Sequence, residues 1–256
     1  MRHITDPVPD ADESLAATTL VEHLFPPQVH RLPGLEIAVA YRQAGNREHV
    51  GGDIIDVYRL LNKNTILSIA DISGKGVKAA VDAALIKYSM RAYASEGFLP
   101  EDILRSLNRL YNEKNLNDGE ESFVTAFVAS FEPKTGTLRF ASAAHEPIAV
   151  CDPGIPAYAL QMTAPMLAVF DDPANLFRGS SLKVKKRTLL VAATDGLIEC
   201  RAPNGEFFGM PRFLRLIDDN RERDVEDVLA ALLGAAESFS RAEYEDDTAI
   251  LVARFL

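Results

Sequence analysis

The sequence has no tryptophan, only two cysteines and no long apolar run. The two thiols, Cys151 and Cys200, lie far apart and match no zinc-binding or redox spacing, so we expect two free structural cysteines. No segment reaches the roughly 18 consecutive apolar residues that would cross a bilayer. Residues 1–13 are polar and acidic and lack the apolar core of a signal peptide. The sequence therefore predicts a cytoplasmic protein with no membrane partner.

Basic residues are also scarce relative to acidic ones. Lys and Arg number 27 against 37 Asp and Glu, which gives a formal net charge of −10. A field of this sign repels a polyphosphate backbone, so we expect no nucleic-acid partner. An acidic excess is either an ordinary solvated surface or a sign of carboxylates gathered around metal ions, and the positions of the aspartates decide between these.

The chain of 256 residues is long enough for one large domain. Residues 1–33 are interpreted as a leader or linker, because a run of acids precedes a short helix predicted over 13–24, which the prolines at 26 and 27 end. This helix either packs at the periphery or joins the chain to an upstream sensory module. The remaining residues, 34–256, are predicted to form a single domain.

Alternating or continuous apolar patterns predict strands, and apolar residues at helical spacing predict helices. Strands are expected over 35–41, 53–61, 65–72, 123–131, 137–143, 188–193 and 249–255, and helices over 77–88, 100–111 and 225–236. Because strands follow strands and helices follow helices, the pattern predicts an α+β fold with antiparallel sheets flanked by helices rather than an alternating parallel fold.

Aspartates recur where these predicted strands begin or end. Asp53 follows two glycines, Asp71 ends a strand, Asp195 follows an apolar strand, and Asp246 and Asp247 precede the last strand. Two unscreened carboxylates ~4 Å apart repel by about 4 kcal/mol at an effective dielectric of ~20, so a cluster of them needs bound cations. Oxygen-only ligands favour hard ions such as Mg²⁺, Mn²⁺ or Ca²⁺ over zinc. Each aspartate taken alone is more often just a turn residue.

The local sequence strings give a sharper interpretation. They read VGGDIIDV at 50–57, ADISGKGV at 70–77, ATDGLIE at 193–199, FFG at 207–209 and DDT at 246–248. In this order they resemble the motifs of the SpoIIE/RsbU branch of the PPM metal-dependent protein phosphatases. The resemblance covers about residues 15–256, and the segment TLVEHLFP at 19–26 is similar to the helix that precedes the domain in this branch. It implies an αββα fold, an antiparallel β-sandwich flanked by pairs of helices.

The resemblance also implies roles for individual residues. Asp71 would bridge two ions of Mn²⁺ or Mg²⁺, and Ile72 would add its backbone carbonyl. Asp195 and Asp246 would hold the first ion, with Asp246 placed ahead of Asp247 by its alignment with the first Asp of the family's pair. Asp53 would hold the second ion directly or through water. These four aspartates, at 53, 71, 195 and 246, are the predicted catalytic residues.

The sequence departs from the family pattern at several positions. Ile54 and Ile55 replace the usual Phe-Tyr, and AAHEP at 143–147 replaces Ala-Gly-His-x-Pro. His145 is a candidate general acid, but a structural histidine whose hydrogen bonds are satisfied is the more common finding for such a residue. Ser73 occupies the position where eukaryotic relatives carry a histidine, and no arginine clamp for phosphate is evident.

Three functions follow as alternatives. The first is a phosphatase for phosphoserine or phosphothreonine on a protein, which the resemblance implies is a bacterial anti-anti-sigma-type regulator in a partner-switching pathway. The second is a catalytically weak, phosphatase-like binding module, against which the full set of aspartates argues. The third is a hydrolase of small phosphate esters, which only substrate tests separate from the first. The resemblance further suggests a homodimer formed through the helix at 13–24.

Overall fold

The computed structural model describes residues 31–42, 51–74, 76–119, 121–170, 176–240 and 246–256. The helix predicted over 13–24, and the homodimer assigned to it, lie outside the described residues. Arg31 and Leu32 form a short strand against the next one, so the described part of the sheet begins within the segment predicted as a leader. None of the described helices is both long and apolar enough to cross a membrane.

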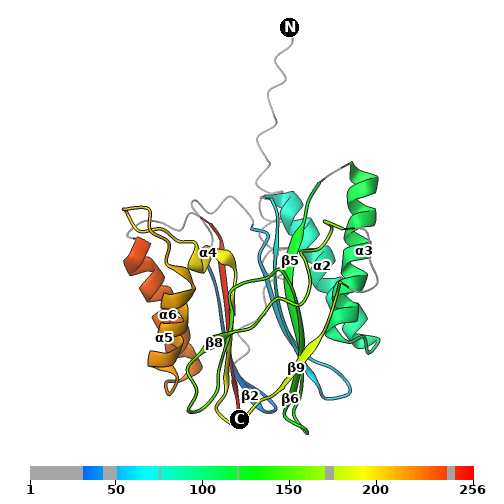
Figure 1. Ribbon diagram of the computed structural model, residues 1–256. Coiled ribbons are helices and arrows are strands. Elements are labelled where there is room, and N and C mark those ends of the chain that lie inside the picture. Colours follow the sequence, from blue (N-terminus) through cyan, green and yellow to red (C-terminus); the bar gives the residue numbers. More distant parts are fainter. Residues whose placement is uncertain (1–30, 43–50, 75, 120, 171–175, 241–245) are drawn as a thin grey trace, which may run out of the picture.

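The strands form two sheets that pack face to face (Figure 1). In spatial order, the first sheet contains β1 (Arg31–Leu32), β2 (Leu35–Arg42), β11 (Thr248–Phe255), β10 (Leu189–Ala193), β7 (Ile148–Cys151) and β8 (Tyr158–Ala159). The second contains β3 (Ile54–Arg59), β4 (Thr65–Ile72), β5 (Val124–Glu132), β6 (Thr137–Ala143) and β9 (Ser180–Lys183). Every paired neighbour in both sheets runs antiparallel.

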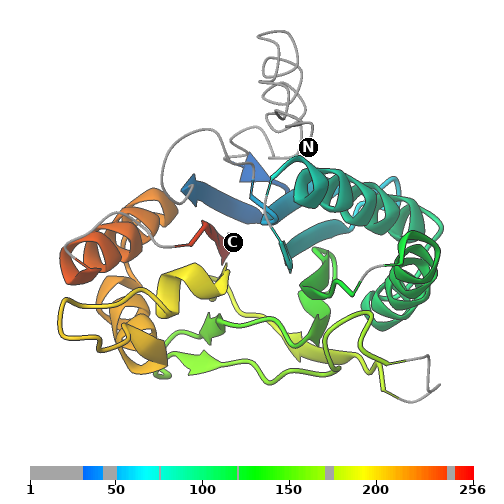
Figure 2. The same cartoon turned by 90° about the horizontal axis from the view of Figure 1, so that it is seen from above.

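Helices cover the outer face of each sheet, as Figure 2 shows from above. The second sheet carries α2 (Val77–Ser95) and α3 (Pro100–Asp118), and the first carries α4 (Asp195–Ile198), α5 (Gly209–Asn220) and α6 (Val225–Ser240). The α+β class and the αββα arrangement predicted from the sequence are therefore confirmed. The helix α2 continues to Ser95, beyond the repeat that predicted it, and α5 begins at the glycine of the FFG segment.

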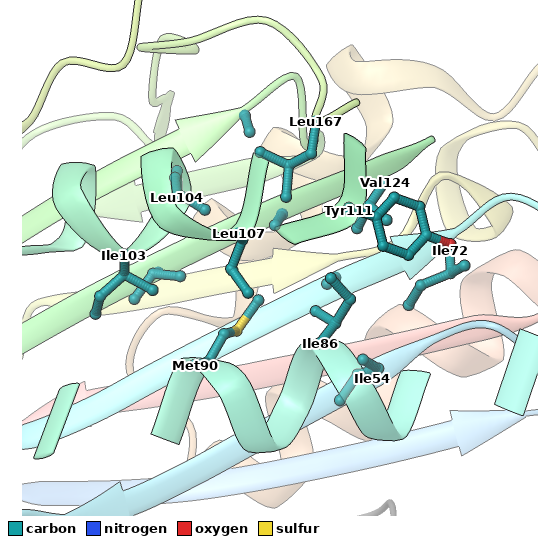
Figure 3. Close-up of a cluster of buried hydrophobic side chains, with 14 of the residues drawn as sticks. Ile54, Ile72, Ile86, Met90, Ile103, Leu104, Leu107, Tyr111, Val124 and Leu167 are labelled. Carbon is teal, nitrogen blue, oxygen red and sulfur yellow. The ribbon is translucent and has the colours of Figure 1, made fainter. Parts of the chain in front are cut away.

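Three apolar clusters hold the layers together, and strand alternation explains them. Along β5, Phe127 and Phe131 point into the space between the sheets, whereas Val124 and Val128 point toward α2 and α3. Figure 3 shows the helix-side cluster, in which Tyr111 of α3 lies beside β5 and the end of β4. The central strands β10 and β11 are buried on both faces, which is why they read as continuous apolar runs.

The sequence analysis missed one strand of consequence, β7 (Ile148–Cys151). Its four residues are all buried and pair with β10, yet the run is short and the loop-rich segment that follows hides it. The register explains why chemistry gathers at one end of the sandwich. The start of β3 pairs with the end of β4, and the end of β10 pairs with the start of β11.

Candidate metal centre

The predicted site residues converge at one end of the sandwich. Asp53 immediately precedes β3, and Asp71 is the penultimate residue of β4 in the same sheet. Asp195 begins α4 directly after β10, and the pair Asp246 and Asp247 precedes β11 in the other sheet. Each sheet therefore contributes one half of a carboxylate cluster.

Asp53 is the most deeply buried member, with 4% of its surface exposed. Its Oδ2 accepts a hydrogen bond of 2.7 Å from the Thr194 hydroxyl, which follows β10 in the opposite sheet. Burial raises the pKa of Asp53 well above its usual value, and the carboxylate of Asp71 raises it further, while the Thr194 hydroxyl opposes this shift.

Asp71 lies beside Asp53 on the same inner face. Burial, followed by the charge of Asp195, raises the pKa of Asp71 to about 6, against a hydrogen bond with Asp53 that lowers it. The adjacent Ile72 carbonyl faces the Gly-Gly-Asp turn so closely that a Cβ on Gly52 would lie 2.3 Å from its oxygen. Only glycine fits at position 52, which brings a backbone oxygen and two carboxylates to one place.

The other half of the cluster forms around Asp195. Asp195 is exposed on one side, but its partial burial raises its pKa, and the charges of Glu199 and then Asp246 add to the effect. Gly196 is required here, because a Cβ on it would lie 2.0 Å from the Asp247 backbone carbonyl. The turn that presents Asp195 is thus pressed against the segment that presents Asp246.

Asp246 and Asp247 face different surroundings. The Asp247 carboxylate is turned toward the Gly-Gly-Asp turn, since a Cβ on Gly51 would lie 1.7 Å from its Oδ2 and 2.3 Å from the Tyr41 hydroxyl. Burial raises the pKa of Tyr41, and a hydrogen bond with Asp247 adds to this shift. Asp246 is exposed, and its charge acts on Asp71 and Asp195.

The loop after Asp71 is held by backbone pairing. The Ser73 hydroxyl accepts a hydrogen bond of 2.9 Å from the Phe123 N–H, and the Ser73 N–H donates one of 3.0 Å to the Phe123 carbonyl. Gly74 and Gly76 both have positive φ, of 113° and 84°, which glycine adopts without strain. This loop leads directly into α2, so the helix begins at the candidate centre.

His145 is a structural residue in this arrangement. It is 1% exposed, its Nδ1 lies 2.8 Å from the Thr125 hydroxyl, and burial lowers its pKa to about 4. A buried neutral imidazole of this kind is a poor proton donor at neutral pH. The geometry therefore favours the structural alternative for His145 over that of a general acid.

Sequence reasoning missed two polar residues that the structure places at the site, Thr194 and Tyr41. Thr194 is 0% exposed and touches Asp53, and Tyr41 borders Asp247. A signal for Thr194 was present, since a hydroxyl between an apolar strand and the Asp195 turn is unusual in a buried position. Tyr41 carried no such signal, because it continues the alternation of a half-buried strand.

The donor set fits a hard divalent cation. Carboxylates and one backbone carbonyl are oxygen ligands. Burial first, and neighbouring negative charge second, raise the pKa values of Asp53, Asp71 and Asp195, and a bound cation would offset both effects. Across the ranges that the structure describes, no three carboxylate, histidine or cysteine side chains form a ready-made metal cage. Mg²⁺ needs none, because it keeps several waters and is held by one or two carboxylates.

Comparison with known proteins decides the family. The model of the family described as Stage II sporulation protein E (SpoIIE) matches residues 62–256. The chain belongs to the SpoIIE family. This SpoIIE-family chain is 26% identical to "Phosphoserine phosphatase RsbU" of Bacillus subtilis (strain 168) over 189 residues, which make up 73% of the chain and 55% of that relative. The chain thus spans about half the length of RsbU.

Solved structures share the fold of the SpoIIE-family chain. The RsbU and RsbW domains of Rv1364c from Mycobacterium tuberculosis align with a TM-score of 0.74 and 22% identity, covering 88% of this chain and 60% of that one. RsbX in complex with magnesium aligns with a TM-score of 0.67 and 16% identity, covering 90% and 99%. At these identities the likeness shows the fold.

Proposed function

We propose that this chain is a metal-dependent phosphatase that hydrolyses phosphoserine or phosphothreonine on a protein. One observation carries the proposal. Carboxylates from both sheets meet at one end of the sandwich, and the pKa values of three of them are raised by burial and by neighbouring carboxylates. Perturbed pKa values of this kind cluster at functional sites.

In this proposal each residue has a defined task. Asp71 would hold both of two ions of Mn²⁺ or Mg²⁺ and Ile72 would add its backbone carbonyl, while Asp195 and Asp246 would hold the first ion and Asp53 the second, directly or through water. When bound, such ions supply a nucleophilic water near neutral pH and neutralise charge on the phosphate. The surroundings of Asp247 support a different task, since its carboxylate faces Tyr41 and Gly51. We assign it to hold the turn that carries Asp53.

The substrate is proposed from two sources. RsbU, to which the chain is similar, is named as a phosphoserine phosphatase. The family resemblance implies a regulator of the anti-anti-sigma type in a partner-switching pathway, and the net charge of −10 argues against a nucleic-acid partner. Formation of a homodimer through the helix at 13–24 stays a prediction. If the homodimer forms in this way, deletion of residues 1–30 should lower the particle mass measured by sedimentation.

The test is release of phosphate from a phosphoserine peptide with Mn²⁺, with Mg²⁺ and with chelator. We expect metal-dependent release that Asp195→Asn lowers by roughly 10³-fold, about 4 kcal/mol of transition-state stabilisation. The matched control is Asp227→Asn on α6, whose carboxylate is 57% exposed and pairs with Arg223 at 3.6 Å. This control is expected to keep full activity.

Two other outcomes would redirect the assignment. Wild-type protein that binds Mn²⁺ in calorimetry but releases no phosphate from any phosphoprotein would support the binding-module alternative. Release from a small ester such as p-nitrophenyl phosphate, with none from phosphopeptides, would support a small-ester hydrolase.

A further inference from the structure

Thr194 links the two carboxylate half-sites. Among the described residues, its side chain makes the one hydrogen bond between these halves whose distance is known. It follows β10 in the first sheet, and its hydroxyl donates to Oδ2 of Asp53, which precedes β3 in the second sheet, at 2.7 Å. Both residues are buried, with exposed fractions of 0% for Thr194 and 4% for Asp53. A hydrogen bond to a carboxylate in such surroundings is stronger than one between neutral groups.

A second contact agrees with this direction of the hydrogen bond. The Thr194 hydroxyl accepts the N–H of Ala249, at 2.9 Å, and the Thr194 N–H donates to the Ala249 carbonyl at 3.0 Å. A threonine hydroxyl has a single hydrogen. The contact with Ala249 uses a lone pair and not this hydrogen, which is therefore available for Asp53. Ala249 lies in β11, just after Asp246 and Asp247, so one hydroxyl touches both halves of the site.

We propose that Thr194 is a positioning residue that locks the carboxylate of Asp53 and the start of β11 into one arrangement for metal binding. This inference rests on the proposed function, since it concerns the same metal centre. The hydroxyl engages Oδ2 and so sets the orientation of a carboxylate that would hold an ion directly or through water. It also holds a carboxylate in place beside Asp71, whose charge opposes it.

The structure offers a set of matched variants. Thr194→Val keeps the shape and removes the hydroxyl, whereas Thr194→Ser keeps the hydroxyl. Thr65→Val is the control, because Thr65 is also 0% exposed and its hydroxyl has no hydrogen-bond partner in the described part of the chain. Thr65 begins β4, at the end of the strand opposite Asp71.

The readouts are the Kd for Mn²⁺ by calorimetry and the Tm in chelator. Loss of an outer contact to a metal ligand usually weakens metal affinity by about 10–100-fold, and we expect Thr194→Val to fall in that range. Thr194→Ser is expected to remain within about 3-fold of wild type, and Thr65→Val to bind Mn²⁺ like wild type. In an Asp53→Ala background, Thr194→Val is expected to cause no further loss of affinity.

Each contrary outcome has a distinct meaning. A Thr194→Val variant with lowered Tm and wild-type Mn²⁺ affinity overturns the proposal, and so does an equal loss of affinity in the Asp53→Ala background. Should the valine variant fail to fold, Thr194→Cys, a weak donor of similar size, takes its place with the same expected direction. Wild-type protein that binds no Mn²⁺ would reject the proposed function and this inference together, whereas normal wild-type binding with an unaffected Thr194→Val rejects this inference alone.

Discussion

Asp53 and Asp56 are two buried aspartates three residues apart, and their charged neighbours are of opposite sign. Asp56 is 1% exposed and accepts hydrogen bonds of 2.6 and 2.7 Å from the Arg91 guanidinium, with the Lys87 ammonium 3.8 Å away. Asp53 is equally buried but has carboxylates, rather than cations, as its charged neighbours. A compensated buried charge indicates a structural role, and an uncompensated cluster indicates a site prepared for a ligand.

The alternation of β3 explains how neighbouring positions come to differ. Ile54 points to the helix layer and Ile55 to the space between the sheets. Asp56 shares the helix side, where α2 offers Lys87 and Arg91, while Asp53 lies on the inner side near Thr194. The two carboxylates thus face different layers. Cations balance the charge of Asp56, whereas the charged neighbours of Asp53 are carboxylates.

The largest expected difference in stability comes from removing each carboxylate in turn. Asp56→Ala leaves Lys87 and Arg91 without their partner and should destabilise the protein by about 3–5 kcal/mol. Asp53→Ala removes a repelled charge, so it should cost far less stability in chelator, while it should weaken Mn²⁺ binding. Urea denaturation in chelator measures the first effect and calorimetry the second. Equal losses of stability for both variants would contradict the distinction.

The sequence predicted the long paired strands, the helices α2, α3 and α6, and five aspartates that the structure brings to one end of the sandwich, because alternation and turn motifs are local properties. It did not reveal the partner of any carboxylate. The bond from Thr194 to Asp53 spans 141 residues, and that from Arg91 to Asp56 spans 35. These contacts depend on which face of which sheet each residue occupies. The short strand β7 was not predicted for another reason, because four apolar residues are too few to show a periodic pattern.

The pH dependence of stability should separate the two kinds of buried aspartate. Burial and Asp195 raise the pKa of Asp71 from 3.8 to about 6. The folded protein then binds a proton more tightly than the unfolded chain. Without metal, its free energy of unfolding should therefore fall as the pH rises from about 4 to about 6, by about 1–2 kcal/mol for this group.

Denaturation in chelator across this pH range provides the measurement, with Asp71→Asn as the variant that flattens the profile. Added Mn²⁺ should reverse the trend at neutral pH, because the ion binds the deprotonated carboxylates. A wild-type profile in chelator that falls no more steeply than that of Asp71→Asn would show that the folded protein does not raise the pKa of Asp71.

The smallest expected effect concerns Tyr41, whose hydroxyl borders Asp247 and the Gly51 turn. Tyr41→Phe removes one hydroxyl from beside a half-buried carboxylate and should lower stability by about 1 kcal/mol. If Asp247 only holds the turn, Mn²⁺ affinity should change by less than about 3-fold in Tyr41→Phe and in Asp247→Asn, since an amide oxygen still accepts a hydrogen bond. Asp246→Asn, at the neighbouring position, should weaken Mn²⁺ binding far more. A strong loss in Asp247→Asn with little change in Asp246→Asn would exchange the two assignments and make Tyr41 a support for a metal ligand.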